Sequence, residues 1–416
     1  MTTTINNEHK KLNVPNLRFP EFQGEWDKYE LGDICDIITD FVAAGSFASL
    51  RENVKYYQEN NYAQLIRTID LKNNFTNSDF VYVDEVAYDF LWRVQLKEPN
   101  IVLPNIGANI GEKYYVKPQD LPKNKNVLGP NAILLRSKCN DTHFVYFRLS
   151  TSSYDNEMKK LVGASGQPKF NKTDLKKVSL FMPSLIEQKR IAYFLALLEE
   201  RIATQNKIIE DLKKLKSAII ENHYNQTEKQ TVSIADLGEP FSVGNLAKDD
   251  LTETGMPCVI YGELFTTYGE TISQIESHTN KTTGMILSKK GDLLFPSSTT
   301  VDAMSLIAPS VINVDGVILG GDMFGIHINH IYNAQYLSYY FNHIAKRQLA
   351  KFAKGSTIIH LHYADIEKAK LLLPSLKEQN RMAKCLVALD KKVSVEQNLL
   401  SSLTCQKSYL LQQIFI

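Results

Sequence analysis

The chain contains a long internal repeat. The segment Pro183-Ser-Leu-Ile-Glu-Gln-Lys-Arg190 returns as Pro374-Ser-Leu-Lys-Glu-Gln-Asn-Arg381, 191 positions later (374 − 183). No gap is needed to extend the match, because Leu195, Leu198, Leu212 and Lys216 fall on Leu386, Leu389, Leu403 and Lys407. A repeat of this length indicates two copies of one structural unit. The 416 residues leave room for two to three domains, each able to bury its own core.

Each copy of the repeat opens with a helix-start pattern. Ser184 with Glu187, and Ser375 with Glu378, directly follow a proline and predict a capping box, in which the glutamate reaches back to the cap. Apolar residues then recur at four- and three-residue steps, in the first copy at Ile191, Leu195, Leu198, Ile202, Ile209, Leu212 and Ile219. This 3.5-residue period is typical of a coiled-coil seam. A helix from Ser184 to Asn222 would be about 55–60 Å long.

The seam is polar at the same two places in both copies, at Gln205 and Glu396 and at Lys216 and Lys407. These residues are either polar positions tolerated near water or devices that fix the register of the helix pair. Further apolar residues lie off the seam, namely Phe194, Leu197, Ile208, Ile220, Leu399 and Leu411. Because two helices alone would leave that apolar surface exposed to solvent, we expect helices of a partner protein to cover it.

The connectivity predicts the arrangement of the two helices. If a pseudo-dyad relates the copies, the helices are antiparallel, with one globular domain at each end of a rigid bar. The expected boundaries are 1–183 and 229–374 for the globular domains, and 184–228 and 375–416 for the helical segments. The predicted fold class is therefore α+β, with two α/β domains joined by two long antiparallel coiled-coil helices.

The globular segments resemble each other only at their ends. Tyr29-Glu-Leu-Gly-Asp-Ile34 corresponds to Val232-Ser-Ile-Ala-Asp-Leu237, and the sequences then diverge until the repeated helices. Short apolar runs separated by Gly, Asn, Ser and Thr predict a twisted, mostly antiparallel sheet in each domain. Matched helices with divergent heads suggest one assembly surface carrying two different recognition surfaces.

Basic residues gather just before both repeated helices, although the net charge of the chain is only +1. A solvated lysine face is one interpretation of such runs, and a nucleic-acid surface is the other. Their occurrence at equivalent places favours nucleic acid, with lysines on phosphates and small polar side chains near base edges. The candidate residues are Lys160, Ser165, Gln167, Lys169 and Lys172 in copy one, and Lys351, Lys354, Ser356, Thr357, His360 and His362 in copy two.

Loops that follow predicted strands supply further candidates. Two of these strands end in proline, before Asn105-Ile-Gly-Ala-Asn109 and before Ser297-Ser-Thr-Thr300. Arg67-Thr68 follows another strand, and Tyr261-Gly-Glu-Leu264 is its possible counterpart. The candidate base or phosphate contacts here are Arg67, Thr68, Asn105, Asn109, Ser297, Ser298 and Thr299.

The sequence contains no recognisable catalytic motif. It has no G-x-x-x-x-G-K-[ST] loop, no glycine-rich methyl-donor loop, no Asn/Asp-Pro-Pro-Tyr/Phe segment and no H-E-x-x-H. The five cysteines are scattered, which argues against a zinc site or a disulfide framework and favours a reducing cytoplasm. Neither a signal peptide nor a membrane span is evident. We therefore expect a cytoplasmic protein without a metal or catalytic site.

The order of head, Pro-Ser-Leu-x-Glu-Gln-x-Arg and helix, given twice, resembles the specificity subunits of type I restriction-modification systems. The resemblance covers essentially the whole chain and includes the loop Gly166-Gln-Pro-Lys-Phe170 and the opening Trp26–Ile34. Copy two departs from the family's loop, because it has Thr357-Ile-Ile-His-Leu361 in that place.

The resemblance implies that each head is a target-recognition domain reading one half of a bipartite site in double-stranded DNA. It also implies that the helices set the spacing and dock two methylation subunits, in a complex with motor-nuclease restriction subunits. The docking candidates on the repeated motif are Glu187, Gln188, Arg190, Phe194, Glu378, Gln379 and Arg381. S-adenosylmethionine, ATP and Mg would then belong to partner subunits, and this chain would be non-catalytic.

Two other functions are compatible with the residues alone. The chain could be a coiled-coil scaffold that binds proteins and no DNA, or an enzyme with an unrecognised active site. Salt-dependent DNA binding separates the first from a specificity subunit, and activity of the isolated chain separates the second.

Overall fold

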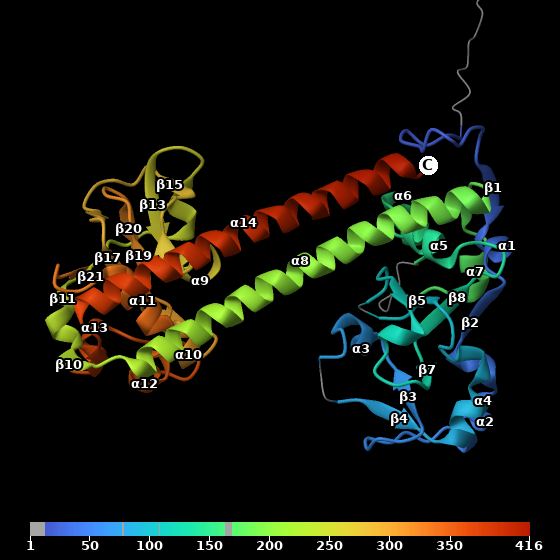
Figure 1. Ribbon diagram of the computed structural model, residues 1–416, viewed down its shortest axis with the longest axis horizontal. Coiled ribbons are helices and arrows are strands. Elements are labelled where there is room, and N and C mark those ends of the chain that lie inside the picture. Colours follow the sequence, from blue (N-terminus) through green and yellow to red (C-terminus); the bar gives the residue numbers. More distant parts are fainter. Residues whose placement is uncertain (1–12, 77–78, 108, 163–168) are drawn as a thin grey trace, which may run out of the picture. The chain divides into compact units, whose positions relative to one another are not determined.

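The computed structural model describes residues 13–76, 79–107, 109–162 and 169–416, and the chain divides into two compact units. Unit 1 comprises Met1–Thr204 and Leu400–Ile416, and unit 2 comprises Gln205–Leu399 (Figure 1). Each unit therefore contains a globular part together with one end of each long helix. The division runs through the helices because each end packs more closely on its own head than on the other half.

Unit 1 is built on two small sheets. A four-stranded antiparallel sheet has the order β2-β8-β5-β6, and a three-stranded sheet has the order β4-β3-β7, in which β3 and β7 are parallel. The strands are β2 Ile37–Asp40, β3 Ala63–Ile66, β4 Val81–Val83, β5 Asn100–Pro104, β6 Tyr114–Val116, β7 Asn126–Leu128 and β8 Ala132–Arg136. Its short helices are α1 Leu31–Ile34, α2 Phe47–Asn53, α3 Thr68–Lys72, α4 Glu85–Phe90, α5 Thr142–Leu149, α6 Ser152–Leu161 and α7 Lys172–Lys176.

Unit 2 has two five-stranded sheets, ordered β11-β21-β17-β19-β14 and β12-β15-β13-β20-β16. The strands are β11 Gly238–Ser242, β12 Leu251–Thr252, β13 Met256–Ile260, β14 Thr271–Ile272, β15 Ser277–Thr279, β16 Ile286–Leu287, β17 Asp292–Pro296, β19 Ser310–Ile312, β20 Ile318–Gly320 and β21 Met323–Ile328. The short helices are α9 Glu263–Thr266, α10 Ala303–Leu306, α11 Ala334–His343, α12 Lys346–Leu349 and α13 Tyr363–Ile366.

The two heads share one topology despite their divergent sequences. The order β2-β8-β5-β6 of unit 1 recurs as β11-β21-β17-β19 in unit 2, and the parallel pair β3/β7 recurs as β13/β20. The sheets of both units are mainly antiparallel, as predicted. The exceptions are the two parallel pairs just named and the parallel pair β14/β19. The duplication therefore extends through the heads, where sequence comparison shows only its ends.

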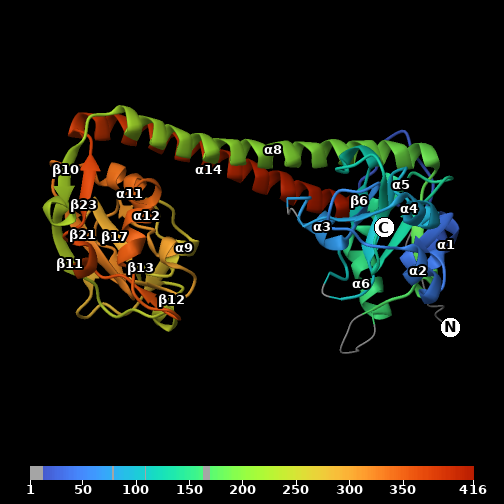
Figure 2. The same cartoon turned by 90° about the horizontal axis from the view of Figure 1, so that it is seen from below.

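A two-stranded ribbon closes each head beside its long helix. In unit 1, β1 Asp27–Glu30 pairs with β9 Ser179–Met182. In unit 2, β10 Gln230–Ser233 pairs with β23 Lys370–Leu373 (Figure 2). Both ribbons are antiparallel, so the beginning of each head returns to the strand that leads into the repeated helix. The correspondence of Tyr29 with Val232 is thereby confirmed, because these residues lie opposite Leu180 and Leu371.

The long helices are α8, Leu185–Gln226, and α14, Leu376–Ile414. In unit 1 the start of α8 shares a core with the end of α14, since Ile191 and Leu195 pack in one cluster with Leu410 and Ile414. In unit 2 the end of α8 packs in one cluster with the start of α14, through Ile220, Met382 and Leu386. The predicted antiparallel pairing is confirmed within each unit.

The polar seam residues are buried or half-buried and paired. Gln205 donates to the backbone carbonyl of Glu396 over 3.1 Å and to its carboxylate. Lys216 contacts Asp390 on α14 at 2.7 Å, and Lys407 contacts Glu199 on α8 at 2.6 Å. Because each polar group meets a specific partner across the helix pair, these contacts support the register interpretation over polar positions tolerated near water.

The capping boxes are only half as predicted. Ser184 and Ser375 each accept from the backbone N–H three residues later, at 3.4 Å. The glutamates have other partners: Glu187 accepts two hydrogen bonds from Arg18, at 2.8 and 2.7 Å, and Glu378 contacts His223 at 3.2 Å. Arg18 supplies a charged donor to Glu187 and Arg381 supplies one to Glu378, and charge-assisted hydrogen bonds of this kind are stronger than a bond to the cap N–H.

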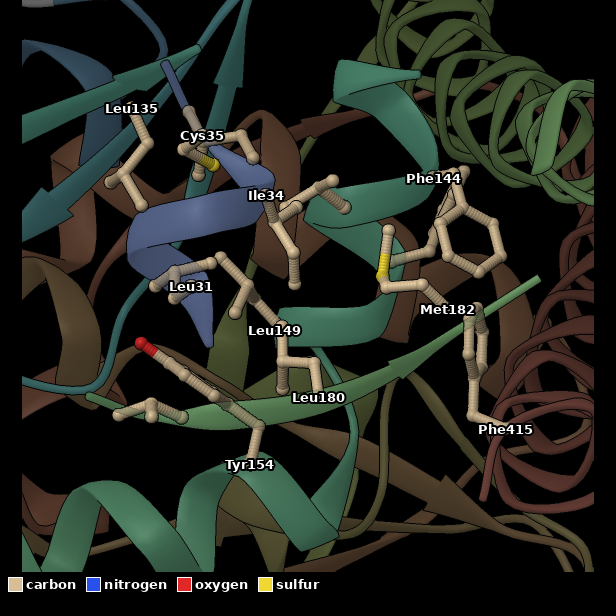
Figure 3. Packing of buried hydrophobic residues seen from close by; sticks show 14 of the residues in the cluster. Leu31, Ile34, Cys35, Leu135, Phe144, Leu149, Tyr154, Leu180, Met182 and Phe415 are labelled. Atoms are coloured by element: carbon tan, nitrogen blue, oxygen red, sulfur yellow. The ribbon is translucent and has the colours of Figure 1, made fainter. Parts of the chain in front are cut away.

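The core of unit 1 joins the head to both long helices (Figure 3). Phe415 lies just beyond α14, with its ring centroid 5.4 Å from that of Phe144 on α5 and 6.3 Å from that of Trp26. All three rings are buried. Edge-on and tilted contacts between aromatic rings stabilise packing beyond the area that they bury. The end of α14 is therefore part of the core of this unit.

Candidate nucleic-acid interface

The structure pairs the same two predicted segments in each unit. In unit 1, Ile106 follows the proline-ended strand β5 and forms a β-bridge with Lys169. In unit 2, β18 Ser298–Thr299 follows the proline-ended strand β17 and pairs with β22 Ile359–His360. The loop after each strand is thus joined to the basic segment before the long helix. We call these pairs the reading segments.

In unit 1 the reading segment is held by the backbone around Asn105. The Asn105 carbonyl accepts from Phe170 N–H at 3.2 Å, and the Asn105 N–H donates to the carbonyl of Asn131 at 3.2 Å. Asn131 has a φ of 66°, which asparagine tolerates better than most residues. Phe170 is buried in the core, so it anchors the neighbouring exposed Lys169.

The other candidates of copy one differ in whether a carboxylate lies beside them. Lys172 contacts Asp40 at 2.7 Å, and Lys160 contacts Glu157 at 2.6 Å on an exposed surface. These carboxylates would compete with phosphates for the two lysines, whereas Lys169 is exposed. Ser165 and Gln167 lie outside the described residues.

A second cluster in unit 1 surrounds α3. Arg67 directly precedes this helix, and its guanidinium donates to Asp70 at 2.7 Å, with a further contact to Asp79. The hydrogen bonds to Asp70, followed by the charges of both aspartates, raise the pKa of Arg67. Lys72, at the other end of α3, donates to Asn109 at 3.0 Å, and Thr68 is half-buried between them. The helix therefore groups Arg67, Thr68 and Asn109.

In unit 2 the reading segment is a short β-ribbon. Leu361 N–H donates to the carbonyl of Ser297 at 2.9 Å, and Ser297 N–H donates to Asp322 at 2.8 Å. Ser297 and Ser298 are buried, at 3 % and 8 % exposure. In this conformation both side chains therefore have little accessible surface, although Ser298 still lines the hollow described below. Thr299 is half-buried and is the more accessible hydroxyl of the three.

The opposite strand of this ribbon ends at His360, and His362 follows as the N-cap of α13. The His360 and His362 rings are stacked at 6.1 Å between centroids and 18° between planes. Lys354 and His360 exchange two backbone hydrogen bonds, of 2.9 and 2.7 Å, which close the loop containing Ser356 and Thr357. Both loop residues are exposed, as is Lys351 before them. This arrangement brings all six predicted residues of the copy-two basic segment to one stretch of surface.

An apolar hollow lies beside each reading segment. In unit 2 it measures about 630 Å³ and is lined by Thr299 together with Tyr261, Phe265, Val301 and Ile358. In unit 1 it measures about 470 Å³ and is lined by Asn105 together with Arg51, Val42, Phe47 and Tyr56. Apolar side chains beside base-reading groups can contact the methyl group of thymine. Asn105, Thr299 and Tyr261 were singled out from the sequence, but the other lining residues named here were missed because they come from segments far apart in the chain.

The repeated motif on the long helices faces inward more than predicted. Glu187, Gln188 and Gln379 are each only 2 % exposed and contact their own unit, so they offer little surface to a partner in this conformation. Arg190, Phe194 and Arg381 have exposed surface, and Glu378 is half-buried beside Arg381. Phe194 also packs edge-on against Phe19, at 5.9 Å between centroids, so the N-terminal segment forms part of that surface.

Neither a metal site nor a membrane-spanning helix is found among the described residues. Within 13–76, 79–107, 109–162 and 169–416, no group of three or more His, Cys, Asp or Glu side chains could hold a metal ion. In that same part of the chain, no helix combines the length and apolar character needed to cross a membrane.

Comparison with known proteins agrees with this twofold design. The sequence model of the type I restriction modification DNA specificity domain matches residues 23–214 and again residues 226–404. The chain belongs to this family. The two matches of the specificity domain each include one head and most of the long helix that follows it.

Relatives of the specificity-domain family align along most of the chain. A Methanocaldococcus jannaschii protein, named putative type I restriction enzyme MjaX specificity subunit, is 23% identical over 414 residues, covering 93% of this chain and 92% of the relative. The MjaVIII specificity subunit of the same organism is 23% identical over 327 residues, covering 72% of this chain and 74% of the relative.

Solved structures of such subunits have a similar fold. The S subunit of a type I restriction-modification system from M. genitalium matches with a TM-score of 0.61 at 16% identity, covering 97% of this chain and 99% of that one. A chain from a structure of type I system assembly and conformational transition matches with a TM-score of 0.53 at 13% identity, covering 94% and 97%. At these identities the likeness concerns the fold.

Proposed function

We propose that this chain is the DNA specificity subunit of a type I restriction-modification complex, with each unit reading one half of a bipartite target. The observation that carries the proposal is the double match to the specificity domain, in which each half has its own reading segment. The recognition domains are assigned to 1–183 and 229–374, and the helical segments to 184–228 and 375–416.

The reading segments suggest how DNA is bound. Exposed Lys169 in unit 1 and exposed Lys351 in unit 2 supply phosphate contacts, which give affinity without sequence preference. Half-buried Thr299 and His360, and the apolar hollows beside the segments, supply contacts to base edges. Because these side chains differ between the units, the two half-sites should differ in sequence.

The long helices serve as spacer and docking surface in this proposal. Exposed apolar residues remain on α8 at Phe194, Leu197 and Ile208, and on α14 at Leu399. Such residues fit helices of two methylation subunits, and motor-nuclease subunits complete the complex in the cytoplasm. S-adenosylmethionine, ATP and Mg then bind to those partner subunits, and this chain contributes recognition rather than catalysis.

The direct test maps methylated sites across the genome in cells with and without this chain. We expect a bipartite motif with a fixed spacer that disappears when the chain is absent. Adenine methylation that continues unchanged without the chain would contradict the proposal. Binding of DNA by the chain with its partners, weakening steeply with salt, separates this function from a protein scaffold that ignores DNA.

The spacer role has a separate test. One helical turn inserted after Ile209 and after Leu400, which occupy equivalent positions in the two helices, should lengthen the preferred spacer while leaving both half-sites unchanged. An unchanged spacer in the methylation map would show that the helices do not set the distance between half-sites.

A further inference from the structure

The glutamine of the repeated motif makes the same two contacts in both units. The side-chain amide of Gln188 donates to the carbonyl of Pro183 at 2.9 Å, and that of Gln379 donates to the carbonyl of Pro374 at 2.9 Å. Their carbonyl oxygens accept from the backbone N–H of Asp141 at 3.0 Å and of Asn333 at 2.9 Å. Both glutamines are 2 % exposed. We call this arrangement the glutamine clamp.

The clamp connects each long helix to a particular element of its head. Asp141 and Asn333 are the N-cap residues of α5 and α11, and their side chains accept from Phe144 N–H and Tyr336 N–H, each at 2.8 Å. These two helices fill the cores, because α5 buries Phe144, Phe147 and Leu149, and α11 buries Leu337, Tyr339 and Phe341. Each glutamine therefore links the first turn of a long helix to the N-terminus of the main core helix.

A neighbouring contact reinforces the clamp in each unit. Gln188 also donates to the side chain of Asn140 at 2.9 Å in unit 1. In unit 2, the Asn333 side chain donates to Asn380, the residue after the clamping glutamine, at 2.7 Å. The two central contacts are identical while these supporting ones differ. Identical geometry within divergent surroundings indicates that the clamp itself is what both units require.

A glutamine suits this position because it donates and accepts at once. Its buried amide satisfies a strand-end carbonyl and an N-cap N–H that would otherwise be left without partners. Apolar packing can hold two helices together while allowing them to rotate or slide, whereas two directional hydrogen bonds fix the angle. An apolar side chain of similar size would keep the packing and lose that constraint.

From this geometry we infer that Gln188 and Gln379 are positioning residues that fix the angle between each reading unit and its long helix, and so restrict the spacer length that the chain accepts. The inference rests on the proposed function, because it assigns to the clamp a role in reading a bipartite site. It gives both glutamines a role within their own unit, whereas the sequence suggested a docking role.

The test uses the full chain with its partners in cells and maps methylated sites for Q188M, Q379M and the double variant. Methionine keeps the length and volume of glutamine and removes the hydrogen bonds of its amide. We expect both half-site sequences to be unchanged, while sites with a spacer one base pair longer or shorter become methylated. The preference for the correct spacer should fall about tenfold in each single variant and further in the double variant, because Q188M removes three buried hydrogen bonds and Q379M removes two.

Matched controls separate the clamp from general loss of stability. I133V in β8 and I326V in β21 weaken the fully buried cores of units 1 and 2 without touching the clamp. The control variants should keep the spacer preference of the unaltered chain, even when their melting temperature falls as much as that of the glutamine variants or more. A broadened spacer in these controls, equal to that of the glutamine variants, would overturn the inference.

The inference is also overturned if Q188M and Q379M are folded and methylate with an unchanged spacer. Should a methionine variant fail to fold, Q188E and Q379E take its place. Glutamate keeps the acceptor for the N-cap N–H, while it loses the donor to proline in both units and the donor to Asn140 in unit 1. An unchanged spacer in these variants counts equally against the inference. A chain that gives no bipartite motif even when unaltered would instead overturn the proposed function, and the inference with it.

Discussion

The two units share their framework and differ where they are proposed to contact DNA. The sheet order, the ribbon beside the long helix and the glutamine clamp occur in both. The reading segments differ: unit 1 has a single bridge between Ile106 and Lys169, whereas unit 2 has a two-residue ribbon with stacked histidines beyond it. Backbone hydrogen bonds and buried residues constrain the framework, while exposed loop side chains are free to change without loss of the fold.

The helix seam shows a second difference between the units. Lys216 is 10 % exposed and contacts Asp390 at 2.7 Å and Glu270 at 2.9 Å, with its ammonium 4.8 Å from the Tyr339 ring centre. Its repeat equivalent in unit 1, Lys407, is 26 % exposed and contacts Glu199 at 2.6 Å. Equivalent lysines thus differ: one is the centre of a largely buried network, and the other belongs to a more solvent-exposed ion pair.

The largest expected effect comes from exchanging a whole head. Replacing residues 29–183 by the corresponding segment of another specificity subunit should replace one half of the methylated motif completely and leave the other half intact. The reason is that each head has its own cores and its own reading segment. Methylation mapping measures this result, and a change in both halves would show that the units do not read independently.

The seam lysines should differ in their contribution to stability. K216A leaves two carboxylates without their cation, one of them largely buried, and should lower the free energy of unfolding by about 3 kcal/mol. K407A removes a more exposed pair and should cost about 1 kcal/mol or less. Urea denaturation of the full chain followed by circular dichroism measures both, because Trp26 and Trp92 lie in unit 1 and their fluorescence would not report on Lys216 in unit 2. Equal losses would mean that burial does not distinguish the two pairs.

Acid should destabilise unit 2 through Glu270. Burial alone would raise the pKa of Glu270, but hydrogen bonding from His343 and the charge of Lys216 outweigh it and lower this pKa to about 2, from an ordinary value of 4.5. A depressed carboxyl pKa stabilises the fold above the unfolded value, so this stability is present at pH 5 and is lost between about pH 4.5 and 2. The loss should reach about 3 kcal/mol, which is the drop of about 2.5 pKa units at about 1.4 kcal/mol each.

The E270Q variant is the control for this acid effect, because it removes the titrating group while keeping a similar shape. Its unfolding free energy should fall less between pH 5 and 3 than that of the unaltered chain. In unit 1, burial opposes the lowering of the pKa of Glu199, while His143 and Lys407 produce it. Hydrogen exchange, which resolves the two units, should therefore show acid loosening in both; an identical pH dependence in E270Q would contradict the assignment to Glu270.

The smallest expected effects concern single phosphate contacts. K169A and K351A should each weaken DNA binding a few-fold at all sequences and lower the slope of log affinity against log salt by about 1. K207A, which changes an exposed lysine on α8, is the matched control and should leave the slope unchanged. Binding titrations at several salt concentrations measure this, and an unchanged slope for K169A would remove Lys169 from the interface.

The sequence alone determined the duplication, the two long helices, their seam and their antiparallel pairing, because local periodicity and a gapless repeat encode all four. It also located the reading segments, since the basic runs and the strand-ending prolines are local signals. It could not predict that Ser297 and Ser298 are buried, or that residues as distant as Tyr261 and Ile358 line one hollow. Burial depends on which segments meet, and that is not a local property.

Tertiary structure alone decided the role of the repeated motif. The pattern Pro-Ser-Leu-x-Glu-Gln-x-Arg predicted a helix cap and a docking surface, and the cap was half right. What Gln188 and Gln379 contact depends on residues 47 and 46 positions earlier in the chain, at the start of α5 and α11. A glutamine on a helix surface has the same sequence signature whether it faces solvent or a neighbouring N-cap, because only the packing of the head decides which polar groups lie within hydrogen-bonding distance.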